Sequence, residues 1–366
     1  MRKFFIIFSL SIIFFSCSID LDLNADYKDI TIIYGLLDKN SDYQYIKVNK
    51  AFLGDASVAE MAAVSDSFIY KTVQVSVKKY KDGEYIKTIP FEYTDTIQKD
   101  SGFFANDRNV IYITDEKIIE ENELNNLNKF TFKLEVKIPN KELITSTTKL
   151  VGDTKKSDTT TTRQDIALYR SLGYESGEYL FFNYHYINAD NTFLTQVYIQ
   201  SFFYEKYGNQ YKLDSNIILC DGYTRTYSPK LGQEVKFIIS GEDYYNKLHK
   251  QLENDKVSER IFYCVRVFYE NAGFNFTEYI EQTQLDYSIA NNGQAYSNIN
   301  NAYGVFSSRS SCYSDYGLLD FHSGSLNHLS DKGSPTVEDR FIGAEETLLF
   351  YDENNSYDIY DLYHDI

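Results

Sequence analysis

The sequence predicts a mainly β protein made of two antiparallel β-sandwich domains, the first immunoglobulin-like and the second with one packed α-helix. Three observations lead to this prediction. The chain holds 34 Tyr and 26 Phe, and aromatic and β-branched side chains favour strands. Short runs that are β-branched or alternate between apolar and polar residues recur along it, without a βαβ rhythm. Residues 152–165 include no apolar side chain, so we expect a solvated loop there that divides the chain in two.

The first half contains about seven short strand-like runs, the number found in an immunoglobulin-like sandwich. Asp82-Gly83 is the turn dipeptide of a two-residue hairpin, so the runs on either side of it are expected to pair. The clearest alternation of apolar and polar residues covers 130–138. The principal expected strands cover residues 30–37, 43–48, 73–77, 85–89, 110–113 and 130–138.

The second half is also rich in strand-like runs and includes one convincing helix. Residues 179–187 and 193–204 flank Asn188-Ala-Asp-Asn, which we interpret as the turn of a hairpin. A strand over 235–239 is followed by a helix near 241–254, with Ser240 as its N-cap and Asp243 in the capping-box position. Its apolar face is expected to pack on a sheet, and a central strand follows. That face carries Tyr245, Leu248 and Leu252, and the central strand covers 261–269.

These patterns predict six segments along the chain. Residues 1–16 are a signal peptide and 17–28 a tether, and 29–150 form the immunoglobulin-like sandwich. A polar linker, a second β-rich domain and an irregular acidic, aromatic C-terminal segment cover 151–175, 176–322 and 323–366.

The first seventeen residues indicate export and a lipid anchor. Arg2 and Lys3 precede a twelve-residue run, 4–15, in which only two Ser are not apolar. This run is too short to span a bilayer as a helix but suits a signal peptide. Ser16-Cys17 then resembles a bacterial lipoprotein signal, which implies cleavage before Cys17 and lipidation of that residue. An ordinary secretory signal, with Cys17 merely the first cysteine, is the alternative.

Two acidic residues shortly after Cys17 bear on the membrane leaflet in which the anchored protein resides. Asp20 and Asp22 resemble the signal that sends Bacteroidota lipoproteins to the outer leaflet, which implies a protein that faces the cell exterior. A plain polar tether is the alternative interpretation. In both cases the predicted partner is the outer membrane, through the lipid on Cys17.

Composition excludes some classes of partner. The formal net charge is −17, with 43% hydrophobic and 24% charged residues, so the chain is expected to fold into globular domains. A strongly acidic protein is not suited to nucleic acid, whose phosphates require a basic face. The same charge disfavours electrostatic binding to anionic lipid head groups.

The cysteines leave the redox state open. If Cys17 is lipidated, Cys220, Cys264 and Cys312 remain, and an exported compartment permits one disulfide with one thiol left over. Buried free thiols at Cys220 and Cys264 are equally compatible with their apolar surroundings. No CxxC spacing occurs, so neither zinc nor a thioredoxin-type motif is expected.

Motifs for catalysis or cofactor binding are lacking, so we expect no enzymatic activity and no cofactor. His322 and His328 share a polar loop with Asp320 and Asp331, but such groups are usually surface residues. The tail from Asp352 alternates acids as a calcium loop does. It has Tyr357 and Tyr363 where that loop needs Gly and Glu, so no metal site is expected.

Several short segments resemble a Bacteroidota outer-membrane lipoprotein family that is defined by a domain of unknown function. They are the signal with Cys17, the run 30–37, the helix segment after Ser240, and a stretch with Asn298, Ile299, Gly304 and Phe306, where Ala302 replaces a usual Gly. In that family the last motif closes the domain. Members are often encoded beside TonB-dependent transporters, which implies a role next to nutrient uptake. No catalytic residues are assigned to the family.

The leading hypothesis is therefore a lipid-anchored, surface-exposed binding or accessory protein that works with a TonB-dependent transporter. A fimbrillin-like pilin is the structural alternative, although pilins are cleaved after an Arg near the first strands and the first Arg here after Cys17 is Arg108. A hydrolase is a third hypothesis, which the absence of hydrolase motifs from the sequence disfavours. A glycan-binding accessory lipoprotein stays open, and a row of exposed Tyr rings on one sheet would favour it.

Overall fold

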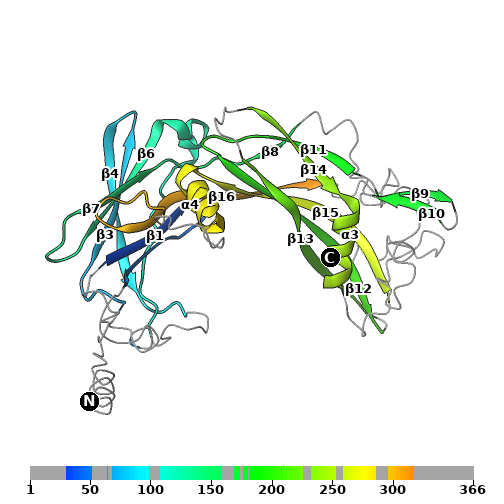
Figure 1. Ribbon diagram of the computed structural model, residues 1–366, viewed down its shortest axis with the longest axis horizontal. Helices are drawn as coiled ribbons and strands as arrows, with labels where there is room; N and C mark the ends of the chain where they lie inside the picture. The colour runs from blue at the N-terminus through cyan, green and yellow to red at the C-terminus, as the bar shows by residue number, and fades with distance from the viewer. Residues whose placement is uncertain are drawn as a thin grey trace, which may run out of the picture.

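The protein is described by a computed structural model for residues 30–51, 64, 68–98, 108–157, 169–173, 176–179, 181–208, 210–225, 232–252, 259–285 and 296–316. Strands dominate these residues, which confirms the predicted mainly β class. One sheet of 11 strands runs through both halves of the molecule, and smaller sheets of three and two strands accompany it. Figure 1 shows the two halves side by side, joined through β16.

The first half is a two-layer sandwich. One layer contains β1, β2 and β5, the other contains β3, β6 and β7, and β4 pairs with β3 and then with β5, so it passes from one layer to the other. The strands are β1 (Ile30–Asp38), β2 (Gln44–Ala51), β3 (Gln74–Lys81), β4 (Glu84–Thr94), β5 (Ile111–Thr114), β6 (Phe130–Lys137) and β7 (Ile144–Thr148), with a 3₁₀ helix, η2 (Glu121–Lys129), before β6.

Lettered A to G in chain order, these seven strands lie in the order A-B-E-D-C-F-G, with D paired to both E and C. A constant-type immunoglobulin sandwich has A-B-E-D in one sheet and C-F-G in the other, without the pairing of D with C that is present here. Membership of the immunoglobulin-like class stays a prediction, because an eighth strand from the far end of the chain lies beside β1.

Local patterns explain most of this half. Alternate residues of β1, β2, β3 and β6 are buried between the layers, among them Ile33, Val77 and Phe132, as the period of two predicts. Asp82 and Gly83 both have positive φ, 49° and 87°, which is the backbone of a type I′ turn. The predicted hairpin is confirmed, since β3 pairs with β4 across this turn.

Strand β16 (Tyr303–Tyr316) joins the two halves. Its first part pairs in parallel with β1, from Ile32↔Tyr303 to Asp38↔Arg309, and its second part pairs antiparallel with β15 (Glu259–Ala272). The prediction of purely antiparallel, separate sandwiches is therefore wrong in this detail. The reason is that the long strand β16 hydrogen-bonds to β1 of the first half and to β15 of the second, which leaves a single continuous sheet.

The segment before β16 closes the first sandwich. Asn298 accepts a hydrogen bond from the Phe306 N–H (3.0 Å) and donates to the Phe306 carbonyl (2.7 Å) and to Ser146 Oγ (3.0 Å). Phe306 is fully buried in the core. Gly304 has φ +112°, and a Cβ there would lie 2.0 Å from the carbonyl oxygen of Ile33. Only glycine allows this close approach of β16 to β1.

The second half is also layered. Strands β13, β12, β15 and the end of β16 form one layer of the large sheet, and a three-stranded sheet of β14, β11 and β8 with helix α3 lies on its inner face. Tyr186 packs on Tyr269 across the layers at 5.9 Å between ring centroids, and the hydroxyls of Tyr244 and Ser201 are hydrogen-bonded. The remaining elements are β8 (Lys155–Lys156), β9 (Tyr169–Gly173), β10 (Ser176–Tyr179), β11 (Phe181–Ile187), β12 (Leu194–Tyr207), β13 (Gln210–Arg225), β14 (Glu234–Ser240) and α3 (Gly241–Gln251).

The predicted hairpin around residues 188–191 is wrong. β11 pairs with β14 and β8, whereas β12 pairs with β13 and β15, so the turn connects two different sheets. Its backbone groups find partners elsewhere: the N–H of Asn188 donates to the Gln233 carbonyl, and the Gly152 N–H donates to the Asp190 carbonyl. These distant partners cannot be seen in the local turn pattern.

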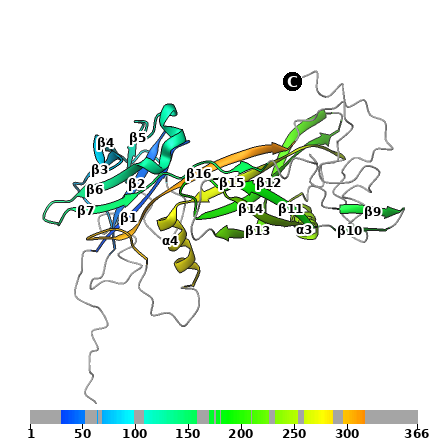
Figure 2. The ribbon, with the colours of Figure 1, turned by 90° about the horizontal axis from the view of Figure 1, so that it is seen from above.

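Helix α3 is where the sequence predicts it, but a second helix was not expected. The N–H of Asp243 donates to Ser240 Oγ at 3.3 Å, so Ser240 is the N-cap, and Leu248 and Leu252 are buried. The additional helix, α4 (Phe274–Leu285), projects from one face of β16 (Figure 2). Aromatic and β-branched residues give α4 little amphipathic periodicity. Its first turn is fixed by a tertiary contact, from the Phe276 N–H to Ser307 Oγ at 3.1 Å.

Candidate binding surface

Several residues singled out in the sequence lie outside the described part of the chain. These are Cys17 in the predicted signal, the pair His322 and His328 with their acidic neighbours, and the acidic tail from Asp352. Cys220 and Cys264 lie on β13 and β15, but the description stops at their backbone. Arg108 lies after β4 and donates to the Tyr93 hydroxyl at 2.8 Å, so four strands precede it.

Cys312 is a free, partly buried thiol. Its Sγ donates to the Thr154 carbonyl at 3.4 Å, and Asn271 Nδ2 donates to the sulfur at 3.6 Å. Burial and the nearby Asp153 raise the pKa of this thiol to about 12, which makes it a poor nucleophile at neutral pH. Among the residues whose positions are described, no group of His, Cys, Asp and Glu is placed to hold a metal ion.

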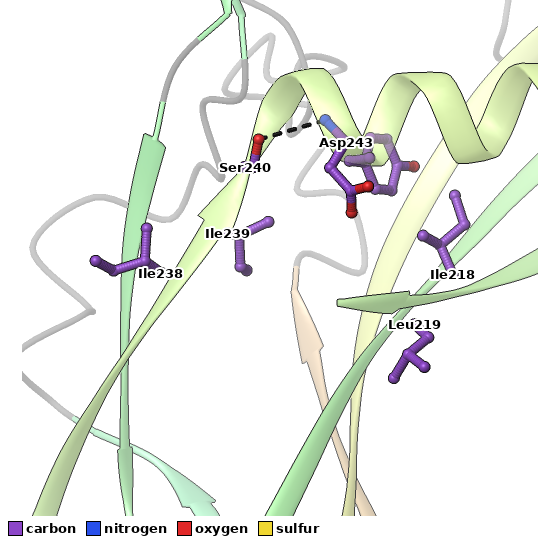
Figure 3. Close-up of a pocket in the computed structure, with 7 residues that line it drawn as sticks. Ile218, Leu219, Ile238, Ile239, Ser240 and Asp243 are labelled. Carbon is purple, nitrogen blue, oxygen red and sulfur yellow. Dashed lines mark hydrogen bonds between the residues drawn. The ribbon is translucent and has the colours of Figure 1, made fainter. Parts of the chain in front are cut away.

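A small cavity lies between α3 and the strands beneath it (Figure 3). Its volume is about 40 Å³, far below the roughly 300–1,000 Å³ of pockets that enclose small ligands. The lining is mostly aliphatic, and its polar members, Ser240 and Asp243, already serve the helix cap. The cavity is a packing gap at the helix start and not a ligand site.

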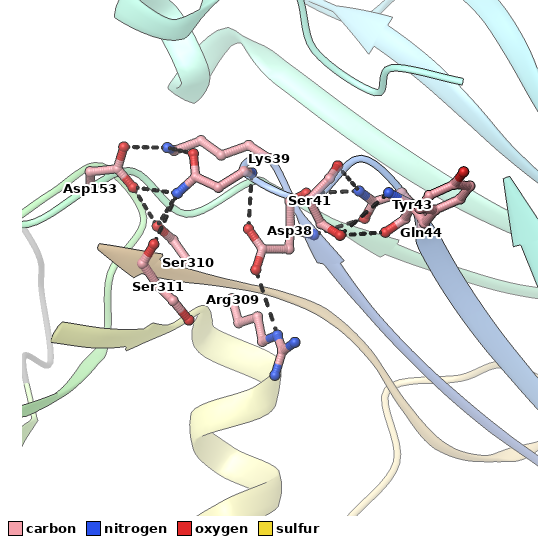
Figure 4. Close-up of polar contacts among 10 residues, drawn as sticks. Asp38, Lys39, Ser41, Tyr43, Gln44, Asp153, Arg309, Ser310 and Ser311 are labelled. Carbon is pink, nitrogen blue, oxygen red and sulfur yellow. Dashed lines mark hydrogen bonds and ion pairs between the residues drawn. The ribbon is translucent and has the colours of Figure 1, made fainter. Parts of the chain in front are cut away.

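A polar network fills the junction between the two halves (Figure 4). Asp153, in the predicted linker, forms an ion pair with Lys39, whose side chain is 3% exposed. Ser310 Oγ donates to Asp153 at 2.5 Å, and Asn40 Nδ2 does so at 3.0 Å. Burial raises the pKa of Asp153, but these hydrogen bonds outweigh it, so the pKa of this carboxyl is lowered.

The second carboxylate of the junction, Asp38, has the opposite shift. Burial raises its pKa, and the Asn40 N–H and Arg309, with Nε at 3.7 Å, only partly offset this effect. Gln44 holds the turn between β1 and β2 by accepting from the Asp38 N–H and donating to its carbonyl. These contacts connect the end of β1 and the turn after it with Asp153 and with β16, so the network joins the two halves.

The most distinctive surface is the outer face of the second half. Four apolar side chains are direct cross-strand neighbours there: Leu219 pairs with Tyr198, Tyr198 with Phe268, and Phe268 with Tyr313. We call these four residues the aromatic row. They lie on β13, β12, β15 and β16, and Leu219 and Tyr313 are 37% and 54% exposed. Phe268 and Tyr313 are in ring contact at 5.7 Å.

Hydrogen-bonding side chains flank the aromatic row on both sides. On one side Gln196 pairs across the sheet with Glu270, and on the other Gln200 pairs with Arg266. The Arg266 guanidinium lies 4.2 Å from the centroid of the Tyr313 ring, a cation–π contact that fixes this charge beside the row. The face therefore presents an apolar centre, in which the rings of Phe268 and Tyr313 are tilted by 49°, between two polar margins.

The electrostatics of the row concern the hydroxyl of Tyr198. The Tyr198 hydroxyl lies 2.9 Å from Gln196 Oε1 and 3.2 Å from Glu270 Oε2. Partial burial and Glu270 raise the pKa of Tyr198 to about 12, so it stays protonated. A surface with neutral rings and fixed donors and acceptors can bind an amphipathic ligand with a flat apolar face and a polar rim.

The first half also exposes tyrosines, but they do not form a row. Tyr34, Tyr45 and Tyr303 are between 40% and 44% exposed. The cross-strand partners of Tyr34 are Lys47 and Val305, so no ring continues the line. Tyr34 packs edge-on against Tyr279 of α4, at 6.1 Å.

The aromatic row was not identified from the sequence. Alternation marks each strand separately, with Tyr198 and Phe268 at positions that face away from buried neighbours. The alignment of four such residues requires the register of three strand pairs, which local patterns do not contain.

No protein-family model matches the chain, and no curated protein matches it in sequence. In the part of the chain that is described, neither helix is long and apolar enough to cross a membrane.

Proposed function

We propose that this chain is a lipid-anchored binding protein of the outer membrane that captures glycans on its aromatic row and assists a TonB-dependent transporter. The observation that carries the proposal is the aromatic row between two polar margins. The glycan-binding alternative expects a row of exposed Tyr rings on one sheet, and the aromatic row supports it in part, with the rings of Tyr198, Phe268 and Tyr313 aligned and Tyr313 the most exposed at 54%.

The anchor and the location rest on the sequence. The apolar run before Cys17 and the resemblance to Bacteroidota lipoproteins support lipidation of Cys17, insertion into the outer membrane and exposure to the cell exterior. The transporter partner rests on that resemblance alone. Tight anchoring would hold the aromatic row near the mouth of a transporter and raise the local concentration of a captured ligand.

Binding is tested directly by retention on immobilised polysaccharides. We expect the full chain to be retarded in native gels that contain a recognised polysaccharide, and Tyr198→Ala, Phe268→Ala and Tyr313→Ala to reduce the retardation. Tyr85→Ala is the matched control, because Tyr85 is 55% exposed on the hairpin of β3 and β4, away from the row. Equal retardation of all four variants would exclude the aromatic row as the site.

The partner is tested by pull-down of the tagged, lipidated protein from its native outer membrane in detergent. Stoichiometric recovery of one transporter barrel is the expected result. Recovery of self-oligomers alone would favour the pilin alternative. A Cys17→Ser variant serves as the control, since it should leave the membrane fraction if Cys17 carries the lipid.

A further inference from the structure

We infer that the aromatic row binds the interior of a neutral oligosaccharide chain, laid across the strands, and not a chain end or a single sugar. This inference rests on the proposed glycan binding and adds the ligand's charge, length and direction. Three observations support it: the strand register of the row, the exposed side chains at both ends of the row, and the charges on the margins of the row.

The register sets the length and the direction. The four members lie on four adjacent strands of the large sheet, and neighbouring strands are about 4.8 Å apart. The row therefore extends about 14 Å at right angles to the strands. The three rings and Leu219, at this regular spacing, can each contact one unit of a repeating chain, so about three to four sugar units fit.

The two ends of the row are open. Leu219 lies on β13, the edge strand of the sheet, where Lys247 Nζ donates to its carbonyl at 3.0 Å and covers the free edge of the backbone but leaves the side chain 37% exposed. At the other end, β16 pairs with β1 only as far as Arg309. Tyr313 lies beyond that point and is 54% exposed. Both end side chains are therefore exposed in the part of the chain that is described, so an oligosaccharide can continue past them.

The charges on the margins favour a neutral ligand. Arg266 on one side of the row is balanced by Glu270 on the other, whereas the whole chain carries −17. An anionic polysaccharide would be repelled at long range, and on the described margins of the row it would meet one cation, Arg266. Gln196 accepts from the Tyr198 hydroxyl and Gln200 donates to Ser215 Oγ, and each amide still has a further donor and a further acceptor site that suit sugar hydroxyl groups.

The test uses full-length protein and has two stages. Affinity gels are first run with a panel of neutral and acidic polysaccharides, and oligomers of one to six units from the best-retained polymer are then titrated by calorimetry. We expect a neutral polymer, an affinity that rises up to three or four units and then levels off, and equal affinity for oligomers with chemically blocked ends. Loss of one ring, in Tyr198→Ala or Phe268→Ala, should weaken binding about two- to tenfold.

The remaining outcomes separate failure of this inference from failure of the proposed glycan binding. Retention by acidic polymers only, full affinity for a monosaccharide, or loss of affinity on blocking an end would overturn this inference and leave the proposed glycan binding intact. Retention by no polysaccharide would refute both. Tyr313→Phe separates folding from binding, because it keeps the exposed ring and should bind as the wild type does. Circular dichroism checks that every variant is folded.

Discussion

Gly304 offers the sharpest test of how the two halves are joined. Its φ of +112° is strained for any side chain, and a Cβ would lie 2.0 Å from the Ile33 carbonyl oxygen and 3.0 Å from the Ile33 nitrogen. The alanine in Gly304→Ala cannot be accommodated by moving a flexible side chain, because every close atom is backbone of β1. The pairing of β1 with β16 must therefore open locally.

The expected loss in the free energy of unfolding has two contributions, the strained backbone at position 304 and the lost hydrogen bonds between β1 and β16. The backbone conformation alone costs about 1–3 kcal/mol, and each lost hydrogen bond between β1 and β16 adds about 1 kcal/mol. Together they reach about 4 kcal/mol, a large part of the roughly 5–15 kcal/mol that keeps a domain folded.

Urea unfolding followed by circular dichroism and tyrosine fluorescence measures this cost, since the chain has no Trp. The matched control is Gly83→Ala, at φ +87° with no atom within 4 Å of the added Cβ, where only backbone strain of about 1 kcal/mol is expected. A midpoint shift more than twice that of the control supports the reasoning. Equal shifts would show that β16 does not approach β1 so closely.

Three further outcomes are expected. Asn298→Ala should lower the free energy of unfolding by about 2–4 kcal/mol, because it leaves the Phe306 N–H and carbonyl unpaired. The control is Asn300→Ala, at an exposed site, which should lower it by well under 1 kcal/mol. Asp153 has a lowered pKa in the folded state, so its stabilisation is present above the unfolded pKa near 4 and disappears as pH falls below it. Asp153→Asn should therefore cost about 1 kcal/mol at pH 7 and progressively less as pH falls through the lowered folded pKa, as urea titrations at several pH values would measure. A cost that does not change with pH would contradict the ion pair. Cys312, with a pKa of about 12, should react with iodoacetamide at pH 8 far more slowly than a thiol of the urea-unfolded chain, as peptide mass spectrometry would measure; equal rates would contradict its burial.

Local patterns were sufficient for most individual elements. The alternation of β1, β3 and β6, the Asp82-Gly83 turn and the Ser240 cap each depend on residues only a few positions apart, and each is found as predicted. The segment around Asn298 and Gly304 was noted for its motif. Its physical role, which is to fasten β16 to β1 and β7, became clear only from its contacts.

Other features depend on partners that are distant in the chain. The Asn188 turn has the composition of a hairpin, but its flanking strands find stronger pairing in different sheets. Helix α4 has the composition of a strand, and the Ser307 hydroxyl and the packing of Tyr279 hold it as a helix. Burial and long-range hydrogen bonds outweigh local propensity at both places.

The sequence by itself determined the class of the protein, its strands, one helix and the expectation of an exported, lipid-anchored chain. Tertiary structure decided that β16 serves both halves and that Leu219, Tyr198, Phe268 and Tyr313 line up on one face. The physical reason is the strand register: a shift of one residue in any of the three pairs would turn a ring to the other face. Pairing across the whole chain sets that register.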